Sequence, residues 1–203
     1  MEDKIKLQPQ EQEELKEICL NWVCNAKCAP PPPHFIKLAT LLRHSLKDST
    51  WIETGTYLGE TAIFLAKFSC HVHTIEPSEE CIKIASPKLA KFKNITIHKG
   101  SSEQCLDKVL SSVKGKVCFW LDGHYSLGIT YKGKNETPIK YELSIIEKYI
   151  NKIDEFIVLV DDIRMSNEDS KNYPPIEYYI DWSKKNDLNW TIENDIFIAK
   201  SKE

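Results

Sequence analysis

The chain has 203 residues, a formal net charge of −3, 28% charged residues and 41% hydrophobic residues. This length predicts one domain with a core large enough for three layers, and the composition is that of an ordinary globular protein. The small negative charge argues against a nucleic-acid partner, and no apolar run is long enough to cross a membrane, so neither partner is expected.

The cysteines and the N-terminus predict a cellular setting. Seven cysteines, an odd number, are spread along the chain, which favours reduced thiols and a cytoplasmic location. Residues 1–17 are rich in charge and contain no apolar run, so we expect no secretory signal. Cys24 and Cys28 are near each other, but no second pair with ligand spacing follows. Scattered free thiols are therefore a better interpretation than a zinc site.

Residues 1–47 are predicted to be a helical extension of the main domain. A first helix is expected over residues 10–23, and the prolines at 30–33 then form a short stiff spacer. A ligand for a proline-binding domain is the alternative interpretation of this run, although it lacks basic flanking residues. A second helix is expected over residues 34–46, and we expect both helices to cover the sheet or the mouth of a site. The apolar stripe of the second helix consists of Phe35, Leu38, Leu41 and Leu42.

Strand-like and helix-like runs alternate in the main domain, residues 48–203. The predicted strands are 51–53, 71–76, 94–99, 116–122, 156–161, 190–193 and 196–200. The predicted helices are 59–68, 78–91, 101–113, 138–150 and 175–185. This alternation predicts an α/β fold, a doubly wound and mostly parallel Rossmann-like sheet of seven strands with helices on both faces. The tight connection at 193–195 predicts that the last two strands form an antiparallel hairpin.

A glycine turn follows the first predicted strand, in the stretch WIETGTYLGE over residues 51–60. Gly55 can adopt a positive φ and lets the backbone approach a ligand closely, and the helix that begins near Gly59 points free N–H groups at the turn. Glu76 ends the next strand and is therefore expected beside this turn, where it can accept hydrogen bonds from ribose hydroxyls. The turn and the acid together predict a cofactor that contains a nucleoside.

Further polar side chains follow the other predicted strands. In an open α/β sheet, ligands bind beyond the carboxyl ends of the strands. Three carboxylates there, Asp122, Asp161 and Asp162, are expected to crowd one rim of the pocket, and their mutual repulsion favours a cation such as Mg²⁺, Mn²⁺ or Ca²⁺. Helix caps and partners for Arg164 are the structural alternative. His124 follows Asp122 and has the right ordinary pKa to act as a general base.

The spacing Glu-x-Gly-x-x-x-Gly is not the dinucleotide fingerprint. With the acid at the end of the second strand, it resembles the first motifs of class I S-adenosylmethionine (SAM)-dependent methyltransferases. The strings LDGHYS, TPIKYEL and VDDIR are similar to those of the branch related to macrocin O-methyltransferase. The resemblance implies that Asp122, Asp161 and Asp162 bind a divalent metal. It also implies that His124, with Asp122 beside it, stands where this branch often has its proposed catalytic Asp.

The resemblance also implies a set of cofactor contacts. Ser101 and Ser102, which follow the third strand, would lie beside the adenine. The full set of residues expected to bind SAM is Glu53, Gly55, Thr56, Tyr57, Gly59, Glu60, Thr61, Glu76, Pro77, Ser101, Ser102, Asp122, His124 and Tyr125. The polar segments 127–137 and 164–175 are expected to form loops over the acceptor site, with Tyr131, Arg164 and Tyr173 near the acceptor.

These observations predict a SAM-dependent, metal-assisted O-methyltransferase. Its acceptor would be a hydroxyl of a small molecule such as a sugar or a glycosylated metabolite, and a homodimer is left open. Two other functions compete with this prediction: a catalytically silent methyltransferase-like interaction module, and an enzyme that uses NAD or another nucleotide on a similar sheet. A metal-dependent hydrolase would leave the glycine turn and Glu76 unexplained.

Overall fold

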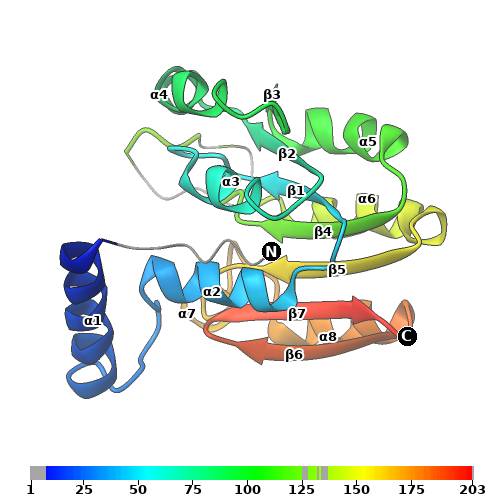
Figure 1. Ribbon diagram of the computed structural model, residues 1–203. Coiled ribbons are helices and arrows are strands. Elements are labelled where there is room, and N and C mark those ends of the chain that lie inside the picture. Colours follow the sequence, from blue (N-terminus) through cyan, green and yellow to red (C-terminus); the bar gives the residue numbers. More distant parts are fainter. Residues whose placement is uncertain (1–7, 125–127, 132, 134–136, 203) are drawn as a thin grey trace.

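A computed structural model describes residues 8–124, 128–131, 133 and 137–202 (Figure 1). Its centre is a seven-stranded sheet with the strand order β3-β2-β1-β4-β5-β7-β6. The strands are β1 (Thr50–Thr54), β2 (His71–Glu76), β3 (Ile95–Lys99), β4 (Lys116–Leu121), β5 (Glu155–Val160), β6 (Leu188–Glu193) and β7 (Ile196–Ser201). The first five strands are parallel, and β7 is antiparallel to both β5 and β6. The predicted doubly wound sheet with a C-terminal hairpin is confirmed.

The helices begin and end within a few residues of the predicted bounds. They are α1 (Pro9–Cys24), α2 (His34–His44), α3 (Glu60–Leu65), α4 (Glu79–Leu89), α5 (Ser102–Ser112), α6 (Ile139–Tyr149), α7 (Met165–Glu168) and α8 (Ile176–Lys185), with a 3-10 turn η1 (Ile150–Lys152) after α6. The short helix α7 was not predicted, because the segment 164–175 is polar and too short to show helical periodicity. No helix among the described residues is both long and apolar enough to cross a membrane.

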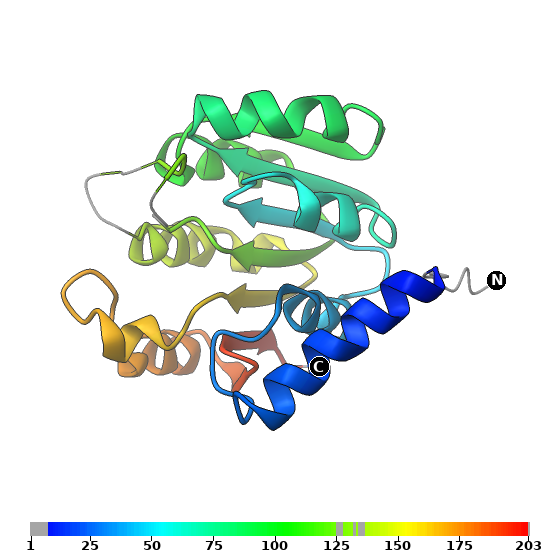
Figure 2. The same cartoon turned by 90° about the vertical axis from the view of Figure 1, so that its left-hand side faces the viewer.

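Helices lie on both faces of the sheet (Figures 1 and 2), and an apolar core lies on each face. One contains Leu106, Leu143 and Trp182, which come from α5, α6 and α8. The other contains Leu41, Leu65 and Ala85, which come from α2, α3 and α4. Neighbouring residues of β1 point to opposite cores, Ile52 to the first and Trp51 to the second. Helices therefore cover both faces, as predicted.

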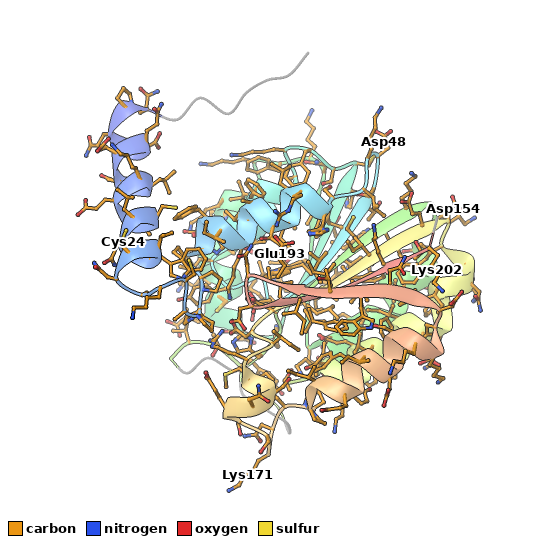
Figure 3. The ribbon with its side chains drawn as sticks, turned by 90° about the horizontal axis from the view of Figure 1, so that it is seen from below. Cys24, Asp48, Asp154, Lys171, Glu193 and Lys202 are labelled. Carbon is orange, nitrogen blue, oxygen red and sulfur yellow. The ribbon has the colours of Figure 1, made fainter. Side chains whose placement is uncertain are left out.

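The two N-terminal helices differ in how they contact this body. Helix α2 turns Thr40 and Leu41 inward, both 0% exposed. Leu42, which was predicted to belong to the apolar stripe of this helix, is 46% exposed. That prediction is wrong, because the buried position next to Leu41 is Thr40 and not Leu42. Helix α1 has no buried residue and projects from the side of the molecule (Figure 3). Whether residues 1–47 form a separate unit stays a prediction.

The sheet contains one point at which the strand order reverses. The chain runs from β1 to β2 and β3 in one direction, and then returns to place β4 and β5 on the other side of β1. Thr54, the last residue of β1, lies between Ile75 of β2 and Leu121 of β4. The residues that follow these three strands therefore meet at one edge, where open α/β sheets bind their ligands.

Candidate active site

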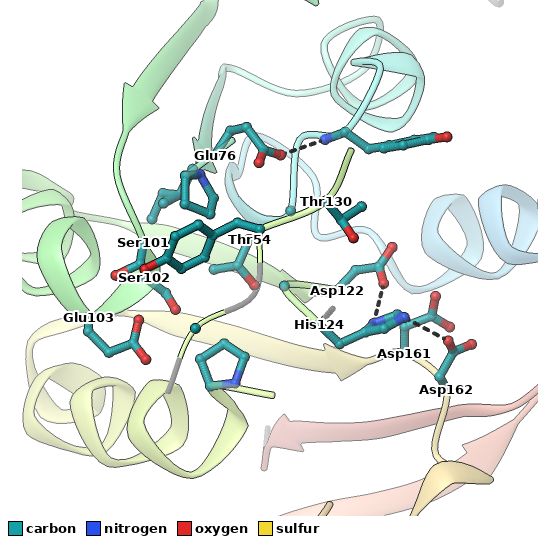
Figure 4. A pocket seen from close by; sticks show the side chains of 18 of the residues that line it. Thr54, Glu76, Ser101, Ser102, Glu103, Asp122, His124, Thr130, Asp161 and Asp162 are labelled. Atoms are coloured by element: carbon teal, nitrogen blue, oxygen red, sulfur yellow. Dashed lines mark hydrogen bonds and ion pairs between the residues drawn. The ribbon is translucent and has the colours of Figure 1, made fainter. Parts of the chain in front are cut away.

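A cavity of about 530 Å³ opens at this edge of the sheet (Figure 4). This volume is typical of a small-molecule site. Among the predicted site residues, those that line it are Gly55, Tyr57, Glu76, Pro77, Ser101, Ser102, Asp122, His124, Asp161 and Asp162. Glu53, Thr56, Gly59, Glu60 and Thr61 are not among its lining residues. Tyr125 lies outside the described residues, and of the predicted loop 127–137 the structure describes 128–131, 133 and 137.

Gly55 joins the turn after β1 to the end of β4. Its φ is +86°, and a Cβ atom added to it would lie 2.4 Å from the carbonyl oxygen of Asp122. Its N–H also donates to the carbonyl oxygen of Ile75 at 2.9 Å. The close approach that requires glycine here is therefore to the protein's own backbone, and it fixes Asp122 beside the turn.

Glu76 holds the same turn from the other side. Its carboxylate accepts hydrogen bonds from the backbone N–H groups of Tyr57 and Ser78, each at 2.8 Å. Burial raises the pKa of Glu76, and these backbone hydrogen bonds partly offset the effect of burial. A carboxylate oxygen can accept more than one hydrogen bond, so Glu76 is also equipped to bind hydroxyl groups in the cavity.

Glu53 lies beneath the turn. It is 0% exposed and accepts a hydrogen bond of 2.5 Å from the Thr74 hydroxyl, which lies 2.5 Å from that of Thr56. Burial raises the pKa of Glu53 to about 8, against the opposing effect of the Thr74 hydrogen bond. This arrangement gives Glu53 a clear structural role, and its contact with a cofactor stays a prediction.

His124 lies between two carboxylates at the far end of the cavity. Its Nδ1 is 3.2 Å from Asp122 Oδ1 and its Nε2 is 3.3 Å from Asp162 Oδ2 (Figure 4). Burial lowers the pKa of His124, but the hydrogen bond and charge of Asp122 and the charge of Asp162 outweigh burial and raise it above the ordinary value. The imidazole is thus fixed at both nitrogens and surrounded by proton acceptors.

Lys37 is the main site residue that sequence reasoning missed. It comes from α2, and its Nζ is 2.6 Å from Asp161 Oδ2 and 2.8 Å from Asp162 Oδ1. Burial opposes its charged form, but the two carboxylates outweigh burial and hold the pKa of Lys37 above its usual range. The available signal was its position: Lys37 precedes Thr40 and Leu41 by three and four residues, so it shares the face of α2 that is buried.

Arg164 and Tyr173, both expected near the acceptor, contact different members of this group: Arg164 contacts Asp162, and Tyr173 contacts His124. The guanidinium of Arg164 is 2.7 Å from Asp162 and also contacts Asp195 in the hairpin turn. The ring of Tyr173 is 6.3 Å from that of His124 and meets it edge to face. Neither lines the cavity, so their contact with an acceptor stays a prediction.

Comparison with known proteins assigns the fold. The sequence matches no family model, and it has no significant match among curated proteins. A candidate caffeoyl-CoA O-methyltransferase from Staphylococcus aureus has a TM-score of 0.54 at 16% identity, over 96% of this chain and 95% of that one. The N-methyltransferase NodS from Bradyrhizobium japonicum has a TM-score of 0.55 at 14% identity, over 82% and 94%. A candidate methyltransferase from Streptococcus mutans, in complex with S-adenosylhomocysteine (SAH), has a TM-score of 0.52 at 15% identity, over 83% and 96%.

The chain has the class I methyltransferase fold. On this fold, the glycine turn, Glu76 and the two serines form one half of the cavity, next to β1, β2 and β3. His124 and the aspartates form the other half, next to β4 and β5. Asp122 lies at the junction, because it packs on Gly55 and contacts His124.

The predicted metal site does not fit this second half as it is folded. Asp161 and Asp162 share the ammonium of Lys37, and Asp162 also pairs with Arg164 and His124. Among the described residues, no group of three or more His, Cys, Asp or Glu side chains is arranged to hold a metal ion. A divalent ion would have to displace Lys37, so we derive no step through a metal.

Proposed function

We propose that the protein is a SAM-dependent O-methyltransferase that acts on a hydroxyl of a small molecule, such as a sugar or a glycosylated metabolite. The observation that supports this proposal most strongly is a continuous cavity on the class I methyltransferase fold, with Gly55 and Glu76 at one end and His124 at the other. The end with Gly55 and Glu76 suits a nucleoside, and the other end carries His124 as a general base. A methyl donor and an acceptor can therefore meet within one cavity.

The cofactor half of the cavity provides groups that match SAM. Glu76 would accept hydrogen bonds from the ribose hydroxyls, as acids at this position do in Rossmann-like folds. Ser101 caps α5, Ser102 is its first residue, and both line the cavity, which suits the polar edge of the adenine. Asp122 lies at the junction of the two halves, where its charge would favour the positive sulfonium.

The acceptor half provides the proton chemistry. Methyl transfer is an in-line displacement: the hydroxyl oxygen attacks the methyl carbon, the carbon–sulfur bond breaks with its electron pair going to sulfur, and SAH leaves. The hydroxyl proton passes to the neutral form of His124. One ring nitrogen keeps its carboxylate partner, and the other exchanges its carboxylate for the acceptor hydroxyl and accepts the proton. The enzyme's main contribution is to position the acceptor oxygen in line with the methyl group.

The oxygen acceptor rests on sequence resemblance to the macrocin O-methyltransferase branch. The structural relatives do not decide it, because they include both an N-methyltransferase and a candidate O-methyltransferase. The divalent metal of that branch is not carried into the proposal, since Lys37 is bound to two of the three expected ligands. Homodimer formation also stays a prediction.

The test is methyl transfer from SAM that carries a tritiated methyl group, with a library of sugars and glycosides as acceptors. We expect the label to appear in a methyl ether, identified by mass spectrometry and NMR, and its formation to fall at least 100-fold in His124→Gln. Transfer to an amine would contradict the oxygen acceptor. Tight SAM binding without transfer to any acceptor would favour the silent interaction module.

A further inference from the structure

Lys37 occupies a buried position that a surface lysine does not normally reach. Its side chain is 13% exposed, and those of Asp161 and Asp162 are 3% and 10% exposed. Exposed ion pairs contribute little and exchange readily with water, whereas a buried cation between two carboxylates is costly to remove. Lys37 is therefore a fixed part of the acidic cluster, and it also lines the cavity.

The position of Lys37 is secured from outside the site. Helix α2 is tied to the turn between β6 and β7, because the Asn194 side chain donates to the Thr40 hydroxyl at 2.9 Å. One turn further, His44 lies 3.1 Å from Glu193. Asp195, which follows Asn194 in the same hairpin turn, pairs with Arg164. The hairpin turn therefore contacts Arg164 directly and, through Thr40, the helix that carries Lys37.

We propose that Lys37 takes the place of a divalent metal, so that its ammonium is the cation of the acceptor half and methyl transfer needs no metal ion. This inference rests on the proposed function. An ammonium has three donors, and Asp161 and Asp162 accept two of them. The third can donate to the hydroxyl oxygen of the acceptor and orient it toward the methyl group while His124 takes the proton. Lys37, a residue of the N-terminal extension, would thereby orient the acceptor oxygen as a metal ion otherwise would.

The proposal makes a prediction about metal binding that needs no acceptor. Removal of the ammonium should open the carboxylates, which are oxygen ligands suited to Mn²⁺. Electron paramagnetic resonance of free Mn²⁺ should therefore detect no binding to the wild-type protein and binding of one ion to Lys37→Met. That ion should be lost again in the double variant Lys37→Met with Asp161→Asn. Lys47→Met, an exposed lysine just beyond α2, is the matched control and should behave as wild type.

Two results would overturn the proposal. One is Mn²⁺ binding to the wild-type protein that is lost in Asp161→Asn, which would mean that the metal and Lys37 coexist. The other is a folded Lys37→Met that gains no Mn²⁺ binding. Calorimetric titration of each variant with SAH is run beside this experiment. SAH binding shows that the variant is folded and that its cofactor half is intact, independently of Mn²⁺ binding. A wild-type protein that does not bind SAH would instead contradict the proposed function. The Mn²⁺ experiment would still test whether Lys37 occupies the position of a metal ion.

Discussion

Gly55 shows how strongly one residue can determine the site. Two separate constraints act on it: a positive φ, which L-residues adopt at a cost, and the carbonyl oxygen of Asp122 at 2.4 Å from any added Cβ. The sequence predicted the first constraint and assigned the close approach to a ligand. The approach is to the chain itself, so Gly55 links the cofactor turn to the residue beside His124.

The two constraints can be separated by comparing two glycines. Gly115 has a φ of +80° and nothing within 4 Å of an added Cβ. Gly115→Ala should therefore cost only the strain of a left-handed residue, about 1–2 kcal/mol of the free energy of unfolding. Gly55→Ala should cost about 1–3 kcal/mol more, because overpacking is added. Urea denaturation measures both, and equal losses would contradict the close packing described at Gly55.

Glu142 of α6 is a second residue whose role the sequence did not reveal. It is 1% exposed, and its Oε1 would lie 3.3 Å from a Cβ added to Gly123. It therefore lies under the turn that carries Asp122 and His124. Burial raises the pKa of Glu142 to about 7, and the nearby Ser102 and Thr54 hydroxyls only partly oppose this effect. Local sequence does not distinguish Glu142, because it is one of two acids in a helix with an apolar face.

The raised pKa of Glu142 predicts a pH dependence of stability. A carboxyl whose pKa is higher in the folded state stabilises the fold fully below its unfolded pKa, and that contribution is lost as the pH rises through about 7. Between pH 5 and pH 8, Glu142→Gln should therefore gain up to about 3 kcal/mol relative to wild type. Urea denaturation across this range measures it. The exposed Glu80→Gln should show no such gain, and a flat difference for Glu142→Gln would contradict the assignment.

At the scale of elements, the two N-terminal helices have different functions. Helix α2 brings Leu41 to a core and Lys37 to the cavity, so it belongs to the catalytic body. Helix α1 buries none of its residues and leaves Ile18, Leu20 and Val23 about half exposed. Sequence periodicity identified both helices correctly. It could not tell them apart, because an apolar stripe does not say which surface, if any, it packs against.

Two truncations test this difference. Deletion of residues 1–24 removes α1 and should lower the free energy of unfolding by no more than about 1 kcal/mol, as expected for exposed residues. Deletion of residues 1–44 also removes Leu41, a fully buried side chain, and should cost at least about 3 kcal/mol. Thermal and urea unfolding provide the measurement. A large loss in the shorter truncation would show that α1 packs on the body.

At the scale of the whole molecule, the sheet was predictable and half of the site was not. Strands β1 and β2 carry buried apolar side chains and end in Glu53, Thr54 and Glu76. Such patterns indicate both the alternation of elements and the edge where ligands bind. The positions of Asp122, Asp161 and Asp162 followed from the same rule. The pairing of Asp161 and Asp162 with Lys37 did not follow, because it depends on how α2 packs, and local sequence does not encode that packing. The pairing of Asp162 with Arg164 was among the alternatives left open by the sequence.

The proposed function requires above all that the half of the cavity beside Gly55 and Glu76 binds SAM. Calorimetric titration with SAH tests it without an acceptor. We predict a one-to-one complex with a dissociation constant in the micromolar range. Glu76→Ala should bind at least tenfold more weakly, a loss of about 1.4 kcal/mol, while Glu79→Ala, exposed in the first turn of α4, should bind as wild type. Failure of folded wild-type protein to bind SAH or SAM, or equal binding by Glu76→Ala, would contradict the account.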